Sequence, residues 1–260
     1  MSFRRKHNTP SFGFELLEYA LRDTSKPTGT RRRLLRRAAV GAAGVAATSV
    51  IPASEPAEVR KNSTDEVGEF VSTTEALTVT ILTELVRRAS LNSVPSSVSV
   101  IFDGVYAAEL DHWNFIHTVF RPSTKRFWIP DGFFGGKGDA LDLAAVGEGV
   151  AAGEHLFINT YLLGATIFAA AREPTFARYA AELAGVEAEH RVLGQSLAGA
   201  SPPNNLGFEV FEFTTVSAIE AALAGAGFGL GQQGSAAGRF YQFPDPPMPP
   251  PIPISGNTPT

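Results

Sequence analysis

The chain has 260 residues, of which 44% are hydrophobic and 18% are charged, a balance typical of a globular protein. This length suits one sizeable domain with additional segments. The absence of cysteine excludes disulfides, zinc–thiolate sites, iron–sulfur clusters and cysteine nucleophiles.

Charge is distributed unevenly along the chain. Residues 1–54 hold 10 of the 22 Lys and Arg residues and 3 of the 26 Asp and Glu residues, which leaves 12 basic and 23 acidic residues and a net charge of −11 in the remainder. Nucleic-acid binding requires a basic face, and an acidic protein does not provide one. We therefore expect no nucleic-acid partner.

The basic first region has the order of an export signal. Thr30–Arg36 (TRRRLLR) precedes a mildly apolar stretch, Ala38–Val50, that is rich in Ala and Gly. This order resembles a twin-arginine signal, whereas the stretch is too short and too rich in alanine for a good membrane span. We expect residues 1–54 to be a signal region that engages the twin-arginine translocation machinery, with cleavage between Ala47 and Ala57. An uncleaved anchor and a basic amphipathic helix are the alternatives.

Four long helices are predicted after a linker at residues 55–64, because apolar residues recur at helical spacing and prolines mark the breaks. Their ranges are 65–90, 96–120, 142–172 and 174–199. The segment 122–139, rich in aromatic residues and glycine, joins the second helix to the third as a long crossover. We expect its aromatic side chains to cover one end of the helices, and a lid over a substrate entrance is the alternative.

The last 60 residues read as an extension and a tail. Within the extension, 201–233, the aromatic segment 208–213 suits an extended conformation. Ser217–Leu223 is predicted to form a short fifth helix, with Ser217 and Glu220 in capping-box spacing. The tail, 234–260, is rich in Gly and Pro. Seven of the ten residues at 244–253 are proline, which predicts an exposed, polyproline-like tail, either passive or bound to a partner.

Two Glu-x-x-His pairs lie within the predicted helices, and each follows a lone glutamate by a nearly equal interval, 34 residues in the first half and 33 in the second. The six residues are Glu75, Glu109, His112, Glu154, Glu187 and His190. Helical positions three apart lie on one face, so both members of a pair can reach one metal ion. This order of ligands is typical of a di-iron or di-manganese site inside a four-helix bundle.

The two pairs also suggest a role for each ligand. Glu109 and Glu187 are placed to bridge two metal ions, each histidine completes one ion, and the two lone glutamates close the outer positions. Four carboxylates balance two divalent ions, and mixed oxygen and imidazole ligands suit iron and manganese. Ordinary surface charges on helices are the alternative.

Glu84 competes with Glu75 for one ligand position. The two residues are nine positions apart and face opposite sides of a helix, so only one can point inward. Glu84 precedes Arg87 and Arg88 at ion-pair spacing, which favours Glu75 as the ligand.

Two further histidines are possible ligands, and two tyrosines could support the site. His117 and His155 lie away from the ligand stripe, and we expect them at the surface or at helix ends. Tyr106 and Tyr161 lie one and two turns from ligands, where they would either support the site by orienting a ligand or donating an electron, or pack in the core.

The segments Thr73–Thr80, Ala107–His112 and Gly185–Leu193 carry a family likeness. Over residues 65–230 the chain resembles the ferritin-like superfamily. More narrowly, it is similar to exported bacterial ferritin-like domain proteins with a twin-arginine signal, a group that includes desiccation-related proteins. The resemblance implies an all-α fold: a four-helix bundle over residues 65–200 with a long crossover between helices 2 and 3, and a dinuclear metal site. The chain differs from shell-forming ferritins in its signal, its long crossover and its C-terminal extension.

The expected function follows from these features. We expect an exported protein, in the periplasm, the cell wall or outside the cell, that binds two iron or manganese ions. It would oxidise metal or react with O2 or peroxide, as a ferroxidase or a manganese catalase does. The alternative is a non-enzymatic structural or stress-protective envelope protein. Assembly into a homo-oligomer is compatible with either.

Overall fold

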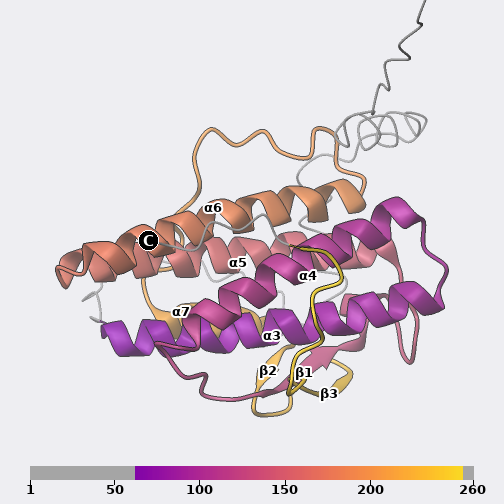
Figure 1. The fold of residues 1–260 in the computed structure, drawn as a ribbon, viewed down its shortest axis with the longest axis horizontal. Helices are drawn as coiled ribbons and strands as arrows, with labels where there is room; N and C mark the ends of the chain where they lie inside the picture. Colours follow the sequence, from indigo (N-terminus) through magenta and orange to yellow (C-terminus); the bar gives the residue numbers. More distant parts are fainter. Residues whose placement is uncertain (1–61, 254–260) are drawn as a thin grey trace, which may run out of the picture.

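A computed structural model describes residues 62–253. The predicted signal region, residues 55–61 of the predicted linker and the last seven residues lie outside this range, so the export signal stays a prediction. The described chain is mostly helical, with one small three-stranded sheet (Figure 1). Its helices are α3 (Thr64–Leu91), α4 (Ser96–Ile116), the 3-10 helix η1 (Asp131–Phe134), α5 (Leu143–Ala170), α6 (Pro174–Leu197) and α7 (Val216–Gly225).

The four predicted long helices are present with nearly the expected ends. α3 begins after Ser63, whose hydroxyl accepts a hydrogen bond from the Glu66 amide, and α5 begins after Asp142, whose carboxylate accepts from two amides. α6 begins at Pro174, as predicted. α4 ends at Ile116, four residues before its predicted end, and a turn follows it.

The four long helices lie side by side, α3 against α4 and α5 against α6 (Figure 1). Two glycines allow a close approach of α5 to α6: a Cβ atom at Gly147 would stand 2.5 Å from the carbonyl oxygen of Gly194. Gly147 lies two turns before Glu154 and Gly194 two turns after Glu187, so the same approach brings these glutamates together.

The expectation of an all-α chain is wrong in one respect, because three strands form a sheet. These are β1 (Arg126–Pro130), β2 (Gly229–Leu230) and β3 (Gly238–Gln242), in the order β2-β1-β3, with β1 antiparallel to both neighbours. Phe127 and Ile129 of β1 are fully buried and belong to the same core as Leu77 and Leu85 of α3. The crossover aromatics therefore cover α3, and the sheet lies beside this helix (Figure 1).

The predicted Gly/Pro-rich tail is largely ordered where it is described. Its first part contains β3 and the buried Phe243. Further along, the hydroxyl of Tyr106 donates to the carbonyl oxygen of Met248 at 2.7 Å, and Met248 packs against the core. The prediction of an exposed tail is thus wrong for these residues, although most of the prolines remain exposed.

The extension also differs in detail from its prediction. α7 begins at Val216, and its cap is Thr215, whose hydroxyl accepts from the Ala218 amide, so Ser217 is not the cap. The segment 208–213 contains no strand, and Phe208 is 91% exposed. Among the described helices, none is both long enough and apolar enough to cross a membrane.

One buried arginine joins α3 to the crossover and the sheet. Arg88 is fully buried and donates to Glu84 at 2.8 Å, to the carbonyl oxygen of Ala140 at 2.6 Å and to the Tyr241 hydroxyl at 3.0 Å. Its guanidinium also stacks 3.9 Å from the centre of the Phe134 ring. Removal of this side chain would leave a cavity and an unpaired carbonyl oxygen at Ala140, while Glu84 would keep its two hydrogen bonds from Arg87.

We predict that Arg88→Ala lowers the free energy of unfolding by about 3–5 kcal/mol, because it breaks a buried ion pair and its hydrogen bonds. Arg87→Ala is the matched control: Arg87 binds the same Glu84 but keeps 44% of its side chain exposed, so we expect a loss below about 1 kcal/mol. Denaturant titration of both variants measures the difference. Equal losses would contradict the structural role given to Arg88.

Candidate metal centre

The structure brings the six predicted ligand residues together in the space between the four long helices. They come from α3 (Glu75), α4 (Glu109 and His112), α5 (Glu154) and α6 (Glu187 and His190). They form two groups, and within each group one candidate ligand atom per residue lies within 4.8 Å of the others. Glu109 and Glu187 belong to both groups. The first group also contains Glu75 and His112, and the second Glu154 and His190.

Each histidine faces both shared carboxylates. The Nδ1 atom of His190 lies 2.7 Å from Glu109 Oε1 and 3.0 Å from Glu187 Oε2. The Nδ1 atom of His112 lies 3.3 Å from Glu187 Oε1 and 3.6 Å from Glu109 Oε2. The two imidazole rings are 6.3 Å apart between centroids. Glu109 and Glu187 therefore occupy the middle of the cluster, with one histidine on each side.

The cluster is buried, which excludes the alternative that these residues are ordinary surface charges. Glu109 and Glu187 are fully buried, and Glu75 and Glu154 keep only 3% and 4% of their surface exposed. Four carboxylates in so small a volume repel one another, and two imidazoles compensate them only in part. Burial of this kind is costly unless the charge is neutralised by protons or by cations.

Burial and mutual repulsion shift the pKa values of the outer glutamates. Burial raises the pKa of Glu75, and the carboxylate of Glu109 raises it further. Burial likewise raises the pKa of Glu154, with Glu187 as the second cause. The outer glutamates therefore favour the protonated form when only protein groups surround them.

The central glutamate and the histidines shift in the opposite sense to what burial would cause. Burial alone would raise the pKa of Glu109, but the nearby imidazoles of His112 and His190 lower the pKa well below its usual value. Burial alone would lower the pKa of both histidines, but the nearby carboxylates of Glu109 and Glu187 raise the pKa of each. Without metal, these shifts favour the protonated imidazoles beside the ionised carboxylate of Glu109.

Of the two tyrosines predicted to support the site, one touches it. Tyr161 is 3% exposed, and its hydroxyl donates a hydrogen bond to Glu75 Oε1. Burial raises the pKa of Tyr161, and the charge of Glu75 raises it further, so the hydroxyl keeps its proton. Tyr106 points elsewhere, because its hydroxyl binds the carbonyl oxygen of Met248. Of the two roles expected for Tyr106, the structure therefore shows packing in the core and not support of the site.

The three residues that were predicted not to be ligands lie outside the cluster. Glu84 pairs with Arg87 at 2.7 Å and with Arg88 at 2.8 Å, as its spacing predicted. His155 lies 3.0 Å from Glu212 in a partly exposed ion pair. His117 follows the last residue of α4, with its ring 2.8 Å from the carbonyl oxygen of Trp113.

The donor set fits a bound metal ion. One oxygen of Glu75 and one of Glu154 are buried without a hydrogen-bond partner, and each belongs to a different group. Buried polar atoms are rarely left unpaired, so an oxygen of this kind is a natural ligand for a cation. Carboxylate oxygens with one imidazole in each group can hold a metal ion.

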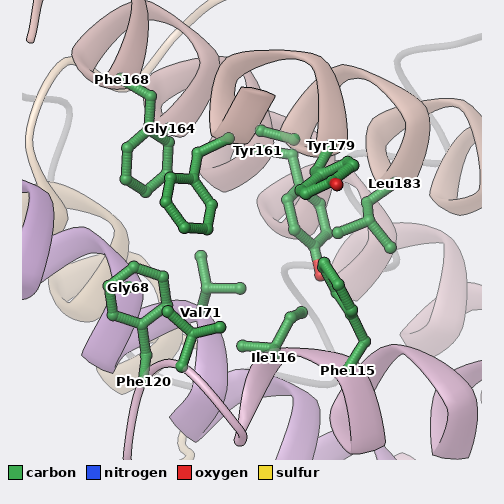
Figure 2. A pocket seen from close by; sticks show the side chains of 13 residues that line it. Gly68, Val71, Phe115, Ile116, Phe120, Tyr161, Gly164, Phe168, Tyr179 and Leu183 are labelled. Atoms are coloured by element: carbon green, nitrogen blue, oxygen red, sulfur yellow. The ribbon is translucent and has the colours of Figure 1, made fainter. Parts of the chain in front are cut away.

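Two features beside the cluster were not predicted from the sequence. Arg191, next to His190, pairs with Glu209 through two hydrogen bonds of 2.6 and 2.5 Å, which hold the loop before α7 against α6. The other feature is a small apolar pocket at the end of the cluster that contains Tyr161 (Figure 2). Three of its lining residues, Val71, Ile116 and Leu183, lie one turn from ligands on three helices, a spacing that the sequence already contains.

Comparisons with protein-family models, with curated proteins and with solved structures found no match for this chain. The geometry of the cluster is therefore the basis on which a function can be assigned.

We predict that metal binding releases protons. A ligand must be deprotonated to bind, and the raised pKa values of Glu75, Glu154, His112 and His190 mean that the metal-free cluster holds protons near neutral pH. Affinity for Mn²⁺ should therefore rise with pH. Calorimetric titration at neutral pH, in buffers of different ionisation enthalpy, should give about one released proton or more per chain. An enthalpy independent of the buffer would contradict the protonation described here.

Proposed function

We propose that this chain is a ferritin-like four-helix bundle protein that holds a dinuclear iron or manganese centre and reacts there with O2 or peroxide. The observation that carries the proposal is the overlap of the two ligand groups, which share Glu109 and Glu187. A carboxylate that belongs to two groups has one oxygen available for each of two ions. The remaining residues divide evenly, with one glutamate and one histidine on each side.

The number and kind of ions follow from charge and ligand type. Four glutamates carry four negative charges when ionised, which two divalent cations neutralise. Carboxylates together with imidazoles suit iron and manganese, which accept oxygen ligands and five or six bonds. Zinc prefers four ligands with more nitrogen or sulfur, and this chain has no cysteine.

The residues of the chain would have distinct roles in such a centre. The shared carboxylates would hold both sides of the centre and each histidine would hold one side, while Tyr161 orients Glu75 through its hydrogen bond. Two bound ions would supply two-electron redox chemistry, which with two protons is enough to reduce O2 to hydrogen peroxide. Burial keeps bulk water away from this reaction.

Two features of the sequence are consistent with this function. The resemblance to the ferritin-like superfamily covers the segments that carry five of the six ligands. The twin-arginine signal belongs to a route that exports folded proteins, so metal could be inserted in the cytoplasm before export. We accordingly propose that the protein acts in the periplasm, the cell wall or outside the cell.

A second candidate is a structural or stress-protective protein of the cell envelope that carries no metal. The observation in its favour is that His190 sits between Glu109 and Glu187 at 2.7 and 3.0 Å, an ion-pair arrangement that compensates charge without a cation. Metal content separates the two candidates.

We predict about two iron or manganese ions per purified full-length chain, since two sides share one pair of carboxylates. The double variant Glu109→Ala/Glu187→Ala should lose both ions, because both belong to each group. Glu189→Ala is the matched control: Glu189 lies on α6 between Glu187 and His190 but is exposed, and should leave the content unchanged. Elemental analysis decides the matter. A content below about 0.2 ions per chain after growth with both metals would favour the structural candidate.

We predict that Tyr161→Phe weakens metal binding or slows the reaction by about tenfold or more, because a hydroxyl that orients a ligand is lost. Tyr106→Phe removes the hydroxyl of another buried tyrosine, one that binds Met248, and should leave both properties unchanged. Metal titration and single-turnover oxidation of Fe(II) measure the two effects. Identical behaviour of the two variants would remove Tyr161 from the site.

A further inference from the structure

A small apolar pocket lies between the four long helices at one end of the cluster. Its volume is about 40 Å³, and aromatic and aliphatic side chains form nearly all of its wall. Figure 2 shows rings from α4, α5 and α6 around it, together with the aliphatic Val71 and Ile116. Phe120 closes one side of the pocket, because Gly68 has no Cβ atom and the ring packs directly against its backbone.

The pocket is stacked one helical turn from the ligands. Val71 lies one turn before Glu75 on α3, and Ile116 lies one turn after His112 on α4. On α6, the pocket residue Leu183 lies one turn before a shared ligand.

Tyr161 is the group between the pocket and the cluster. Its ring lines the pocket (Figure 2). Its hydroxyl binds Glu75. A molecule in the pocket therefore lies against a ligand-bearing turn of three helices and against the tyrosine that contacts the cluster.

The size and chemistry of the pocket select what can enter it. A single water needs about 10–15 Å³ of such volume, whereas a cavity that holds benzene has about 150 Å³. At about 40 Å³ the pocket accepts a molecule of a few atoms and rejects an organic substrate of benzene size. Hydrogen peroxide would lose its hydrogen bonds to water against this wall, which is costly, while O2 has none to lose.

We propose that this pocket binds molecular oxygen, and that the centre therefore takes O2 rather than hydrogen peroxide as its oxidant. The inference rests on the proposed metal centre, and it names the substrate of that centre. O2 bound there would lie against apolar side chains, one helical turn from the ligands, and Tyr161 is the group that links it to them.

Gly164 provides a variant that fills the pocket without disturbing the fold. It lines the pocket from α5, and a Cβ atom there would lie 3.5 Å from Val67 Cγ1 and 3.7 Å from Ala180 Cβ, which are ordinary contacts. Gly153 on the same helix is the matched control, because a Cβ atom there meets nothing within 4 Å. Both Gly→Ala changes favour the helix to a similar extent.

The first measurement tests whether the pocket takes up a small apolar species, with xenon as the probe. Crystals of the full-length protein under xenon pressure should show a xenon atom in the pocket of the wild type and of Gly153→Ala, because xenon is apolar and is readily located by its scattering. In Gly164→Ala, this xenon should be lost or much reduced. The absence of xenon from the wild-type pocket would overturn the proposal.

The second measurement follows the reaction in iron-loaded protein. We expect Gly164→Ala to slow oxidation of bound Fe(II) by limiting O2 by about tenfold, since one methyl group in an apolar pocket has an effect of this order. Its reaction with hydrogen peroxide should match that of Gly153→Ala. Equal O2 rates in the two variants, with iron bound, would overturn this inference alone. A wild-type chain that binds neither iron nor manganese would overturn the proposed function and this inference together.

Discussion

The structure depends on one constraint: four carboxylates are buried together between four helices. Each helix contributes one of them, and only two imidazoles lie among them to offset their charge. Four ionised carboxylates would oppose the packing of the helices, so without a cation the outer two favour the protonated form. A cation between the carboxylates would offset their charge when all four are ionised, and this is the basis of the proposed metal centre.

The rest of the fold holds the four helices in the positions that this cluster needs. Gly147 and Gly194 allow α5 and α6 to approach closely at a point two turns from their glutamates. Arg88, in the last turn of α3, fixes this helix to the segment before α5 and to β3. The sheet and the Met248 segment then cover α3 and α4, so that the core around the ligands is closed by parts of the chain more than 100 residues apart in sequence.

The position of a residue on the face of its helix was predictable from the sequence, whereas the pairing of strands far apart in the chain was not. The two Glu-x-x-His pairs and their upstream glutamates predicted the six residues that converge, because a helix converts spacing into position on a face. The arginines after Glu84 likewise predicted its exclusion from the cluster. The sheet was missed because β1 is five residues long and pairs with strands over 100 residues away in a segment rich in Gly and Pro. The sequence did not decide between the two roles of Tyr106. A position one helical turn before Glu109 can face the ligands or, as here, the segment that contains Met248.

The central claim is that two metal ions share Glu109 and Glu187. Anomalous scattering from crystals of the full-length protein, collected on either side of the iron and manganese absorption edges, tests it most directly. The account predicts two anomalous peaks, one between the shared carboxylates and His112 with Glu75, the other between them and His190 with Glu154. Crystals grown with both metals that show no peak in this cluster would contradict it.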